Sequence, residues 1–214
     1  MRSRFDEQLL FLKRELIEMG ALCEKAIELV AKALETNNAN IYKEVRPISL
    51  EIDHKERDIE ARCLKLLLQQ QPVAKDLRQI SAALKMITDM ERIGDQAEDI
   101  SEIIGYLNGE NLNSIIPVQE MAQASIKMGT ESIDAYVNKD IHLAEVVLKE
   151  DDIIDNYFMD SKKRLIKMIA EAPEHGEYAL DLLMITKYFE RIGDHATNIA
   201  EWVIFSITGE HENA

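Results

Sequence analysis

Two copies of one pentapeptide carry the side chains with the clearest chemical potential in this sequence. Glu-Arg-Ile-Gly-Asp occurs at residues 91–95 and again at 190–194. Helical residues four apart share a face, so each copy brings its Glu close to its Asp. Like charges at this spacing destabilise an isolated helix by about 0.2–0.5 kcal/mol, and a bound cation would offset the repulsion. Carboxylate oxygens are the ligands that hard cations prefer, so each copy is a candidate cation site.

The second copy has a further pair of carboxylates within reach. Asp151 and Asp155 stand four residues apart, at the border of an apolar helical face. We expect their helix to pack antiparallel to the helix that carries Glu190 and Asp194. The four carboxylates would then surround one metal ion or a small cluster of ions.

The first copy has the same arrangement with one carboxylate fewer. Asp53 stands in the place of the second Asp of that pair and can join Glu91 and Asp95. Ser49 stands in the place of the first Asp, which removes one charge. The first site is therefore predicted to be the weaker one. The alternative for both copies is an acidic, solvated helix face that binds no ion.

The glycine inside each pentapeptide is expected to lower the stability of its helix, so its presence there needs an explanation. Gly94 and Gly193 fall within predicted helices, where glycine is less favourable than alanine by about 1 kcal/mol. Such a glycine usually marks a close approach of a neighbouring helix or a ligand that needs room. We predict close helix packing at both positions.

Catalytic patterns are missing from the sequence. It contains no Gly-rich phosphate loop and no Gly-x-Ser-x-Gly motif. The five histidines are scattered, and no Glu-x-x-His pair is expected to line a bundle interior as a di-iron carboxylate enzyme would need. His195 falls off the acidic face of its helix and is predicted to lie at the surface. We therefore do not expect an enzyme.

The elements that position these residues are predicted to be helices. Apolar or small residues recur three and four apart from Leu9 to Ala33, which is typical of one long bundle helix. Similar segments follow, separated by breaks that contain Asn, Gly or Pro. The predicted helices run from Leu9 to Glu35–Asn38, from near Pro47 to Gln69–Pro72, from Pro72 to Gly105, from Val118 to Asn138–Asp140, from Leu143 to Pro173, and through Ile185 to Gly209. Pro47 either starts the second helix or kinks it near its N-terminus.

Composition and repetition together predict the fold class. Only 8 Gly and 4 Pro occur in 214 residues, which suits long helices and argues against a turn-rich all-β fold. The repeated pentapeptide indicates duplication of one supersecondary unit. We predict an all-α protein of two three-helix bundles, with domains at residues 1–107 and 117–214 joined by a linker at 108–116.

The charge balance restricts the classes of partner. The chain has 40 acidic and 25 basic residues and a net charge of −15, which opposes binding to nucleic acid or to anionic lipid. Acidity of this kind favours cations or basic protein surfaces. No run of about 18 uncharged apolar residues and no secretory signal is present, and the two cysteines form no disulfide framework. We expect a cytoplasmic protein.

Several motifs taken together resemble those of the PhoU family. They are the doubled pentapeptide, the Met-Gly pairs at residues 19–20 and 128–129, and the Gln-Pro-Val-Ala-Lys-Asp-Leu-Arg turn at residues 71–78. The resemblance implies two three-helix bundles related by a pseudo-twofold axis, with surface metal sites built from paired acidic motifs. Those motifs map onto two sets of residues, namely Asp53, Glu91 and Asp95, and Asp151, Asp155, Glu190 and Asp194.

The same resemblance implies a regulatory role. It implies that the protein couples the phosphate ABC transporter, through its ATPase and permease, to a membrane sensor histidine kinase, and represses phosphate-starvation signalling. The implied cofactors are divalent or trivalent ions held by carboxylates: iron clusters, with Mn, Mg or Zn as alternatives. We also expect a homodimer that meets the membrane only through partner proteins. A metal-storage protein and a helical scaffold without metal remain as alternative functions.

Overall fold

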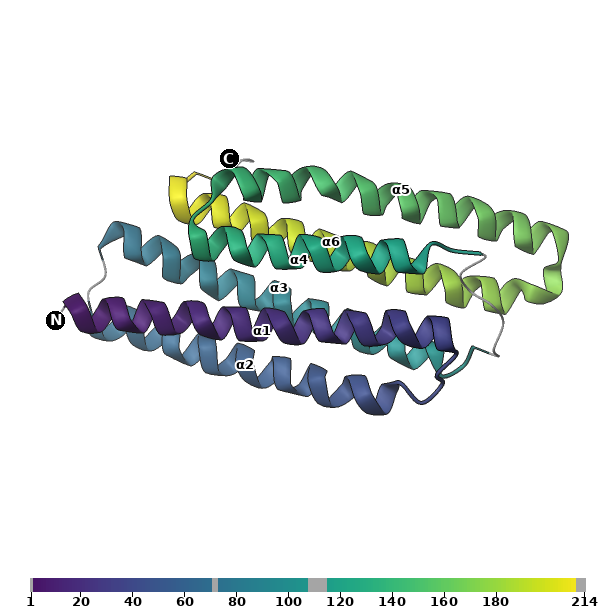
Figure 1. Ribbon diagram of the computed structural model, residues 1–214, viewed down its shortest axis with the longest axis horizontal. Helices are drawn as coiled ribbons and strands as arrows, with labels where there is room; N and C mark the ends of the chain where they lie inside the picture. Colours follow the sequence, from purple (N-terminus) through teal and green to yellow (C-terminus); the bar gives the residue numbers. More distant parts are fainter. Residues whose placement is uncertain (1, 71–72, 108–114, 211–214) are drawn as a thin grey trace.

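The computed structural model describes residues 2–70, 73–107 and 115–210, and this part of the chain is built from helices. Six of them are long α-helices, and a short 3₁₀ turn, η2, precedes the last (Figure 1). Their number and order confirm the predicted all-α class and its two trios. The helices are α1 (Arg2–Thr36), α2 (Tyr42–Gln70), α3 (Ala74–Ile104), α4 (Val118–Asn138), α5 (Ile141–Glu171) and α6 (Gly176–Thr208), with η2 at Pro173–His175.

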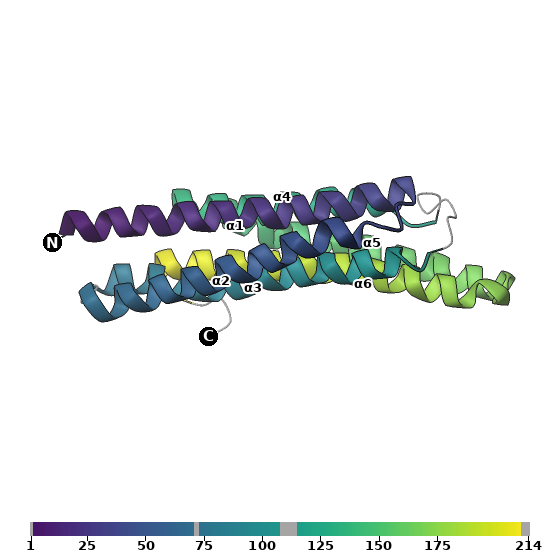
Figure 2. The ribbon, with the colours of Figure 1, turned by 90° about the horizontal axis from the view of Figure 1, so that it is seen from below.

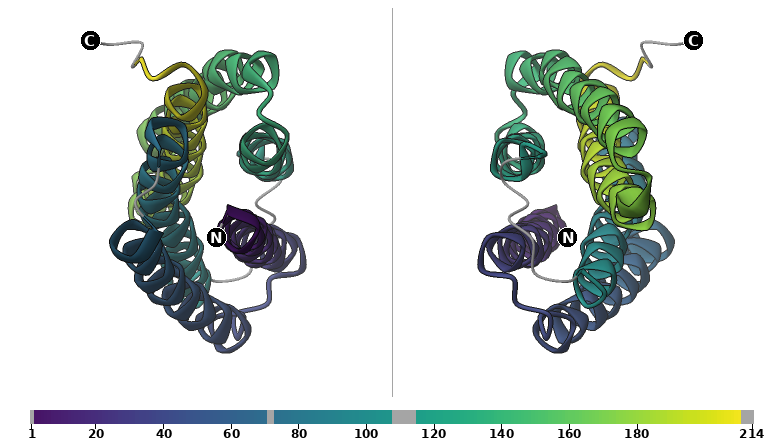
Figure 3. Two further views of the ribbon diagram at one scale, coloured as in Figure 1. Left: turned by 90° about the vertical axis from the view of Figure 1, so that its left-hand side faces the viewer. Right: turned by 90° about the vertical axis from the view of Figure 1, so that its right-hand side faces the viewer.

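The two trios pack side by side along their length and share one core. Viewed end-on, α2, α3, α6 and α5 follow one another in a curved layer, with α1 and α4 on its concave side (Figure 3). Figure 2 shows the same two layers from below, with α1 and α4 apart from α2, α3 and α6. The contact between α3 and α6 is the most extensive of any helix pair. The two helices that carry the pentapeptides therefore lie together at the centre of the curved layer.

Apolar residues that recur three and four apart in the sequence form the core of the molecule, as predicted. Leu12, Leu16 and Met19 of α1 are fully buried, as are Ile154 of α5 and Phe189 of α6. Each such side chain contributes about 1.5–3 kcal/mol by leaving water. None of the helices in the described ranges has an uncharged apolar stretch of the length that a bilayer requires.

The helix ends follow local signals, and the structure decides between the two places expected for Pro47. Lys139, at φ 57°, turns the chain after α4, and the Asp140 carboxylate caps α5 by accepting a 3.0 Å hydrogen bond from the Leu143 amide. The second helix begins at Tyr42, so Pro47 lies inside it near its N-terminus. A proline at this position has no N–H to donate to the carbonyl of Lys43, so it costs helix stability without ending the helix.

Two of the predicted boundaries cannot be compared with the structure. Pro72, the predicted start of the third helix, lies outside the described residues, as do residues 108–114 of the predicted linker. The described part of α3 begins at Ala74. The domain limits 1–107 and 117–214 therefore stay a prediction.

Close helix packing explains both pentapeptide glycines. A Cβ on Gly94 would lie 2.9 Å from Cδ1 of Ile52, and a Cβ on Gly193 would lie 2.9 Å from Cδ1 of Ile154. Each distance is well inside normal van der Waals contact. The glycines therefore let α2 approach α3, and α5 approach α6, in the same way in both repeats. The prediction of close packing is confirmed.

Gly129 offers a contrasting prediction, because nothing lies within 4 Å of the Cβ it lacks. Its place in the middle of α4 costs helix stability without a packing gain. We expect Gly129→Ala to raise the free energy of unfolding by about 0.5–1 kcal/mol and Tm by about 1–4 °C. Differential scanning calorimetry measures this, and a lower Tm would contradict the open environment assigned to this site.

Candidate metal centre

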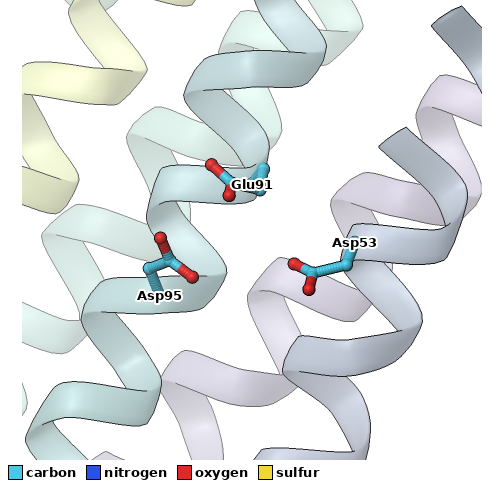
Figure 4. Close-up of side chains that lie close together, drawn as sticks. All are labelled: Asp53, Glu91 and Asp95. Carbon is cyan, nitrogen blue, oxygen red and sulfur yellow. The ribbon is translucent and has the colours of Figure 1, made fainter. Parts of the chain in front are cut away.

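Three of the predicted ligands converge on the surface between α2 and α3. Asp53 comes from α2, and Glu91 and Asp95 come from successive turns of α3 (Figure 4). One carboxylate oxygen of each lies within 4.8 Å of the others, and all three residues are half-buried. A single cation placed among them could contact all three carboxylates.

The packing of the helices brings these carboxylates together. Ile52 fills the space opposite Gly94, which draws α2 against α3. Asp53 follows Ile52 directly, so its carboxylate lies at the edge of that contact. Glu91 and Asp95 flank Gly94 on the facing helix. The glycine that permits close packing is therefore also what brings ligands from two helices within reach of one ion.

The three carboxylates of the first set repel one another. Burial, and then repulsion from Asp95, raises the pKa of Glu91, and Asp53 adds to this effect. Burial raises the pKa of Asp95 as well; Arg92 opposes that shift, and Asp53 reinforces it. Arg92 lies 3.4 Å from a Glu91 oxygen and 3.2 Å from an Asp95 oxygen, yet one guanidinium does not balance three carboxylates. A cation would offset the remaining repulsion.

The donor set narrows the class of ion that fits. It consists of carboxylate oxygens and contains neither histidine nor cysteine. Oxygen-only sets suit hard ions such as Mg²⁺, Ca²⁺ and Mn²⁺, whereas Zn²⁺ prefers nitrogen and sulfur. The residues present therefore fit a hard cation.

The carboxylates of the second set of predicted ligands lie farther apart than those of the first set. No three of Asp151, Asp155, Glu190 and Asp194, all of them described residues, place oxygens within 4.8 Å of one another. The structure thus gathers the set with fewer acids more tightly than the set with four. The role of both sets as ligands stays a prediction.

A lysine accounts for the difference between the two sets. Lys187 of α6 forms an ion pair with Glu190, one turn further along the same helix. The matching position in α3, three residues before Glu91, is Thr88. Glu190 therefore already has a cationic partner, and Glu91 has none at that position. This signal was present in the sequence, because helical residues three apart are neighbours.

The other acids of the second set nevertheless lie close enough to Asp151 to affect its pKa. Burial first, and then repulsion from Asp155, Asp194 and Glu190, raises its pKa to about 6. A carboxyl with a raised pKa contributes stability below its unfolded pKa of about 4, and that contribution is lost as the pH rises through about 6. The metal-free protein should therefore lose stability at this site over that interval.

We expect Asp151→Asn to be more stable than the natural protein in EDTA at pH 7.5, because the amide cannot ionise. The gain should be on the order of 1 kcal/mol after solvent screening, or about 2–4 °C in Tm, and should vanish near pH 4. Thermal unfolding between pH 4 and pH 7.5 measures it, with Asp58→Asn, which changes an exposed carboxylate of α2, as control. A gain that does not change with pH would contradict the assigned repulsion.

One residue predicted to lie at the surface instead contacts the other repeat. His195 is half-buried, and its Nδ1 lies 2.9 Å from Oδ1 of Asp89 on α3. Asn198 donates a 3.1 Å hydrogen bond to the same oxygen. The surface prediction for His195 is wrong because the pairing of α3 with α6 buries this side of α6. Sequence reasoning missed Asp89 because no local signal reports contacts between the two repeats.

Comparison with known proteins supports the repeat seen in the structure. The family model described as the PhoU domain matches the chain twice, at residues 16–104 and 118–203. The chain belongs to the PhoU family. The PhoU domain thus covers both trios of helices, and each match includes one pentapeptide.

Several PhoU relatives match this chain over nearly its full length. A homologue from Clostridium acetobutylicum is 36% identical over 98% of this chain and 96% of its own length. A homologue from Pseudomonas aeruginosa is 32% identical over 97% and 86%. Both are named phosphate-specific transport system accessory protein PhoU homolog.

Solved structures agree in fold. The crystal structure of PhoU from Pseudomonas aeruginosa has a TM-score of 0.91 at 32% identity and covers 96% of this chain and 100% of that chain. A PhoU structure from Streptococcus pneumoniae has a TM-score of 0.86 at 23% identity, with 97% and 98% covered, and supports the fold alone.

Proposed function

We propose that this protein is a negative regulator of phosphate uptake and of phosphate-starvation signalling. The observation that carries the proposal is the similarity, over nearly the whole length of both chains, to relatives named phosphate-specific transport system accessory proteins. A regulatory helical protein also accords with the absence of catalytic motifs from the sequence. In this proposal the protein couples the phosphate ABC transporter to a sensor histidine kinase and is not itself an enzyme.

Metal binding is the second part of the proposal. Asp53 of α2 and Glu91 and Asp95 of α3 would hold one hard cation, for which their oxygens are suitably placed. The ion would supply positive charge where two helices each present carboxylates. The family resemblance adds iron clusters, with Mn or Mg as the alternatives that the oxygen donors also suit. Asp151, Asp155, Glu190 and Asp194 would form the second site.

The cation would act as a link between α2 and α3. With the ion bound, three carboxylates on two helices are held in one arrangement, and without it they repel one another. The surface of α2 and α3 would therefore differ in charge and rigidity between the two states. We propose that partners dock on such helix faces, with the net charge of −15 favouring a basic partner surface. A homodimer, peripheral to the membrane through its partners, completes the proposal.

Gene deletion tests the regulatory part. Loss of the gene should switch on phosphate-scavenging genes in phosphate-rich medium, and the natural gene supplied on a plasmid should restore repression. A variant with Asp53→Ala and Asp95→Ala should restore it poorly if the cation is needed. The exposed-residue variant Asp58→Ala serves as control. Unchanged expression after deletion would contradict the proposal and favour a metal-storage protein or a scaffold.

Partner capture tests the coupling. The tagged protein should retain the transporter ATPase and the histidine kinase from a detergent extract of the membranes of phosphate-fed cells. Retention of the ATPase without the kinase would contradict the proposed link between them.

A further inference from the structure

A polar hollow of about 510 Å³ lies where α2, α3 and α6 meet. It adjoins the candidate metal centre, because Asp53 and Asp95 line both. Three arginines also line it: Arg46 from α2, Arg92 from α3 and Arg191 from α6. A cation bound at the metal centre would therefore stand at the edge of a space that three guanidinium groups help to line.

The charges of the hollow explain why an anion would bind only together with a cation. The three arginines face four lining carboxylates, so the hollow is slightly negative by itself. Arg46 pairs with Glu98, and Arg92 pairs with acids of the metal centre. Arg191 forms no ion pair within 4.0 Å with any described residue, although burial raises the pKa of Asp99, which also lines the hollow, and the charge of Arg191 opposes that rise. A divalent cation at the metal centre reverses the sign of the local charge, which favours an anion beside it.

Two buried polar side chains in the hollow add hydrogen-bonding groups. Gln96 is only 4% exposed, and its Oε1 has no hydrogen-bond partner. A buried amide oxygen without a donor is costly, so an occupant that carries a hydroxyl would satisfy it. Ser49, only 3% exposed, offers a hydroxyl of its own. The hollow thus has donors for oxyanion oxygens and an acceptor that needs a proton.

We propose that this hollow binds hydrogen phosphate next to the cation, with one oxygen on the metal and others at Arg191, Arg46 and Ser49. The phosphate hydroxyl donates to Oε1 of Gln96. This inference rests on the metal centre of the proposed function. A free ion is the expected source of the phosphate, because the net charge of −15 opposes contact with an anionic lipid surface.

The second repeat lacks the residues that would bind phosphate in the first repeat. The hollow is therefore specific to the first repeat. Six residues before Ile52 stands Arg46, whereas six residues before Ile154 stands Leu148. Asp151 replaces Ser49 and adds a negative charge. His195 replaces Gln96 and is already bonded to Asp89. The proposal therefore places one phosphate in each chain.

Coupled binding of manganese and phosphate tests the proposal on the full chain. Free Mn²⁺ is followed by electron paramagnetic resonance, with and without inorganic phosphate, and bound phosphate is measured by equilibrium dialysis. We expect one phosphate per chain only when Mn²⁺ is present, and each ligand should tighten the other by the same factor. Sulfate should bind more weakly, because at neutral pH it has no hydroxyl to donate to Gln96.

Arg191→Gln is the decisive variant. It should weaken phosphate binding at least about tenfold while Mn²⁺ binding without phosphate stays the same or tightens slightly. Arg164→Gln, an exposed arginine of α5 paired with Asp160, removes the same charge elsewhere and should change neither. Circular dichroism confirms that both variants remain folded.

The possible results separate this inference from the proposed function. Tight Mn²⁺ binding that phosphate does not affect would overturn the inference and leave the metal centre standing. Absence of Mn²⁺ binding would overturn both. Equal loss of phosphate in Arg191→Gln and Arg164→Gln, or binding to phosphatidate vesicles in place of free phosphate, would overturn the site assigned here.

Discussion

Replacing Asp53 and Asp95 together with alanine should reduce the affinity of the first centre for Mn²⁺ by at least about 100-fold. Two of its three carboxylates would be lost, one from each helix, and the remaining Glu91 could neither fill the coordination sphere nor link α2 to α3. Isothermal titration calorimetry of protein prepared in EDTA measures the loss. The variant should remain folded, because both side chains are half-buried at the surface and their removal relieves charge repulsion.

Matched variants distinguish this loss from a general effect of charge. Asp58→Ala removes an exposed carboxylate from the same helix outside the cluster, and it should leave Mn²⁺ binding within about threefold of the natural protein. Conversion of Thr88 to Lys supplies the first repeat with the lysine that pairs with an acid in the second. The Thr88→Lys change should weaken Mn²⁺ binding although it alters none of the three coordinating carboxylates. Full Mn²⁺ binding by the double alanine variant would refute the assigned site.

The Gly94→Leu variant should be strongly destabilised, by roughly 2–3 kcal/mol, or about 5–10 °C in Tm. The Cβ alone would lie 2.9 Å from Cδ1 of Ile52, and the rest of a leucine side chain has no room between α2 and α3. The same change should weaken cation binding, because separating the helices carries Asp53 away from Glu91 and Asp95. Thermal unfolding and Mn²⁺ titration of the same sample measure both effects.

A compensating substitution tests the cause of that destabilisation. Ile52→Ala alone leaves a cavity, but in combination with Gly94→Leu it vacates the space that the leucine needs. We expect the double variant to be more stable than the sum of the two single losses predicts, by about 1 kcal/mol or more. Strictly additive losses would mean that the two side chains do not compete for one space.

Local patterns in the sequence were sufficient for the helices and the repeat. The spacing of Leu12, Leu16 and Met19 predicted a helix because the core of a bundle demands that periodicity. Lys139 and Asp140 ended one helix and began the next through their own backbone and side-chain bonds. Helix ends and helix periodicity depend on residues that are close in the chain, so they can be predicted without a structure.

Contacts between the repeats could not be predicted in the same way. The burial of His195 against Asp89 depends on which faces of α3 and α6 meet, and no periodicity within one helix specifies this. The hollow lined by Arg46 and Arg191 depends on three helices at once. Such features follow from the packing of whole units against each other.

The candidate site was predicted in part. Asp53, Glu91 and Asp95 were selected by their spacing and by the repeat, and the structure places their oxygens together. The number of acids alone predicts that the second site is the stronger one. The ion pair of Lys187 with Glu190 changes the balance of charge in the second repeat. Counting both signs of charge within one helical turn would have revealed it.

The position of a bound ion tests directly whether carboxylates from adjoining helices form a cation centre. Crystals grown with Mn²⁺ and measured at the manganese absorption edge give that position from anomalous scattering. We expect a peak within coordinating distance of Asp53, Glu91 and Asp95 together. Manganese-saturated crystals with no anomalous density between α2 and α3 would contradict it.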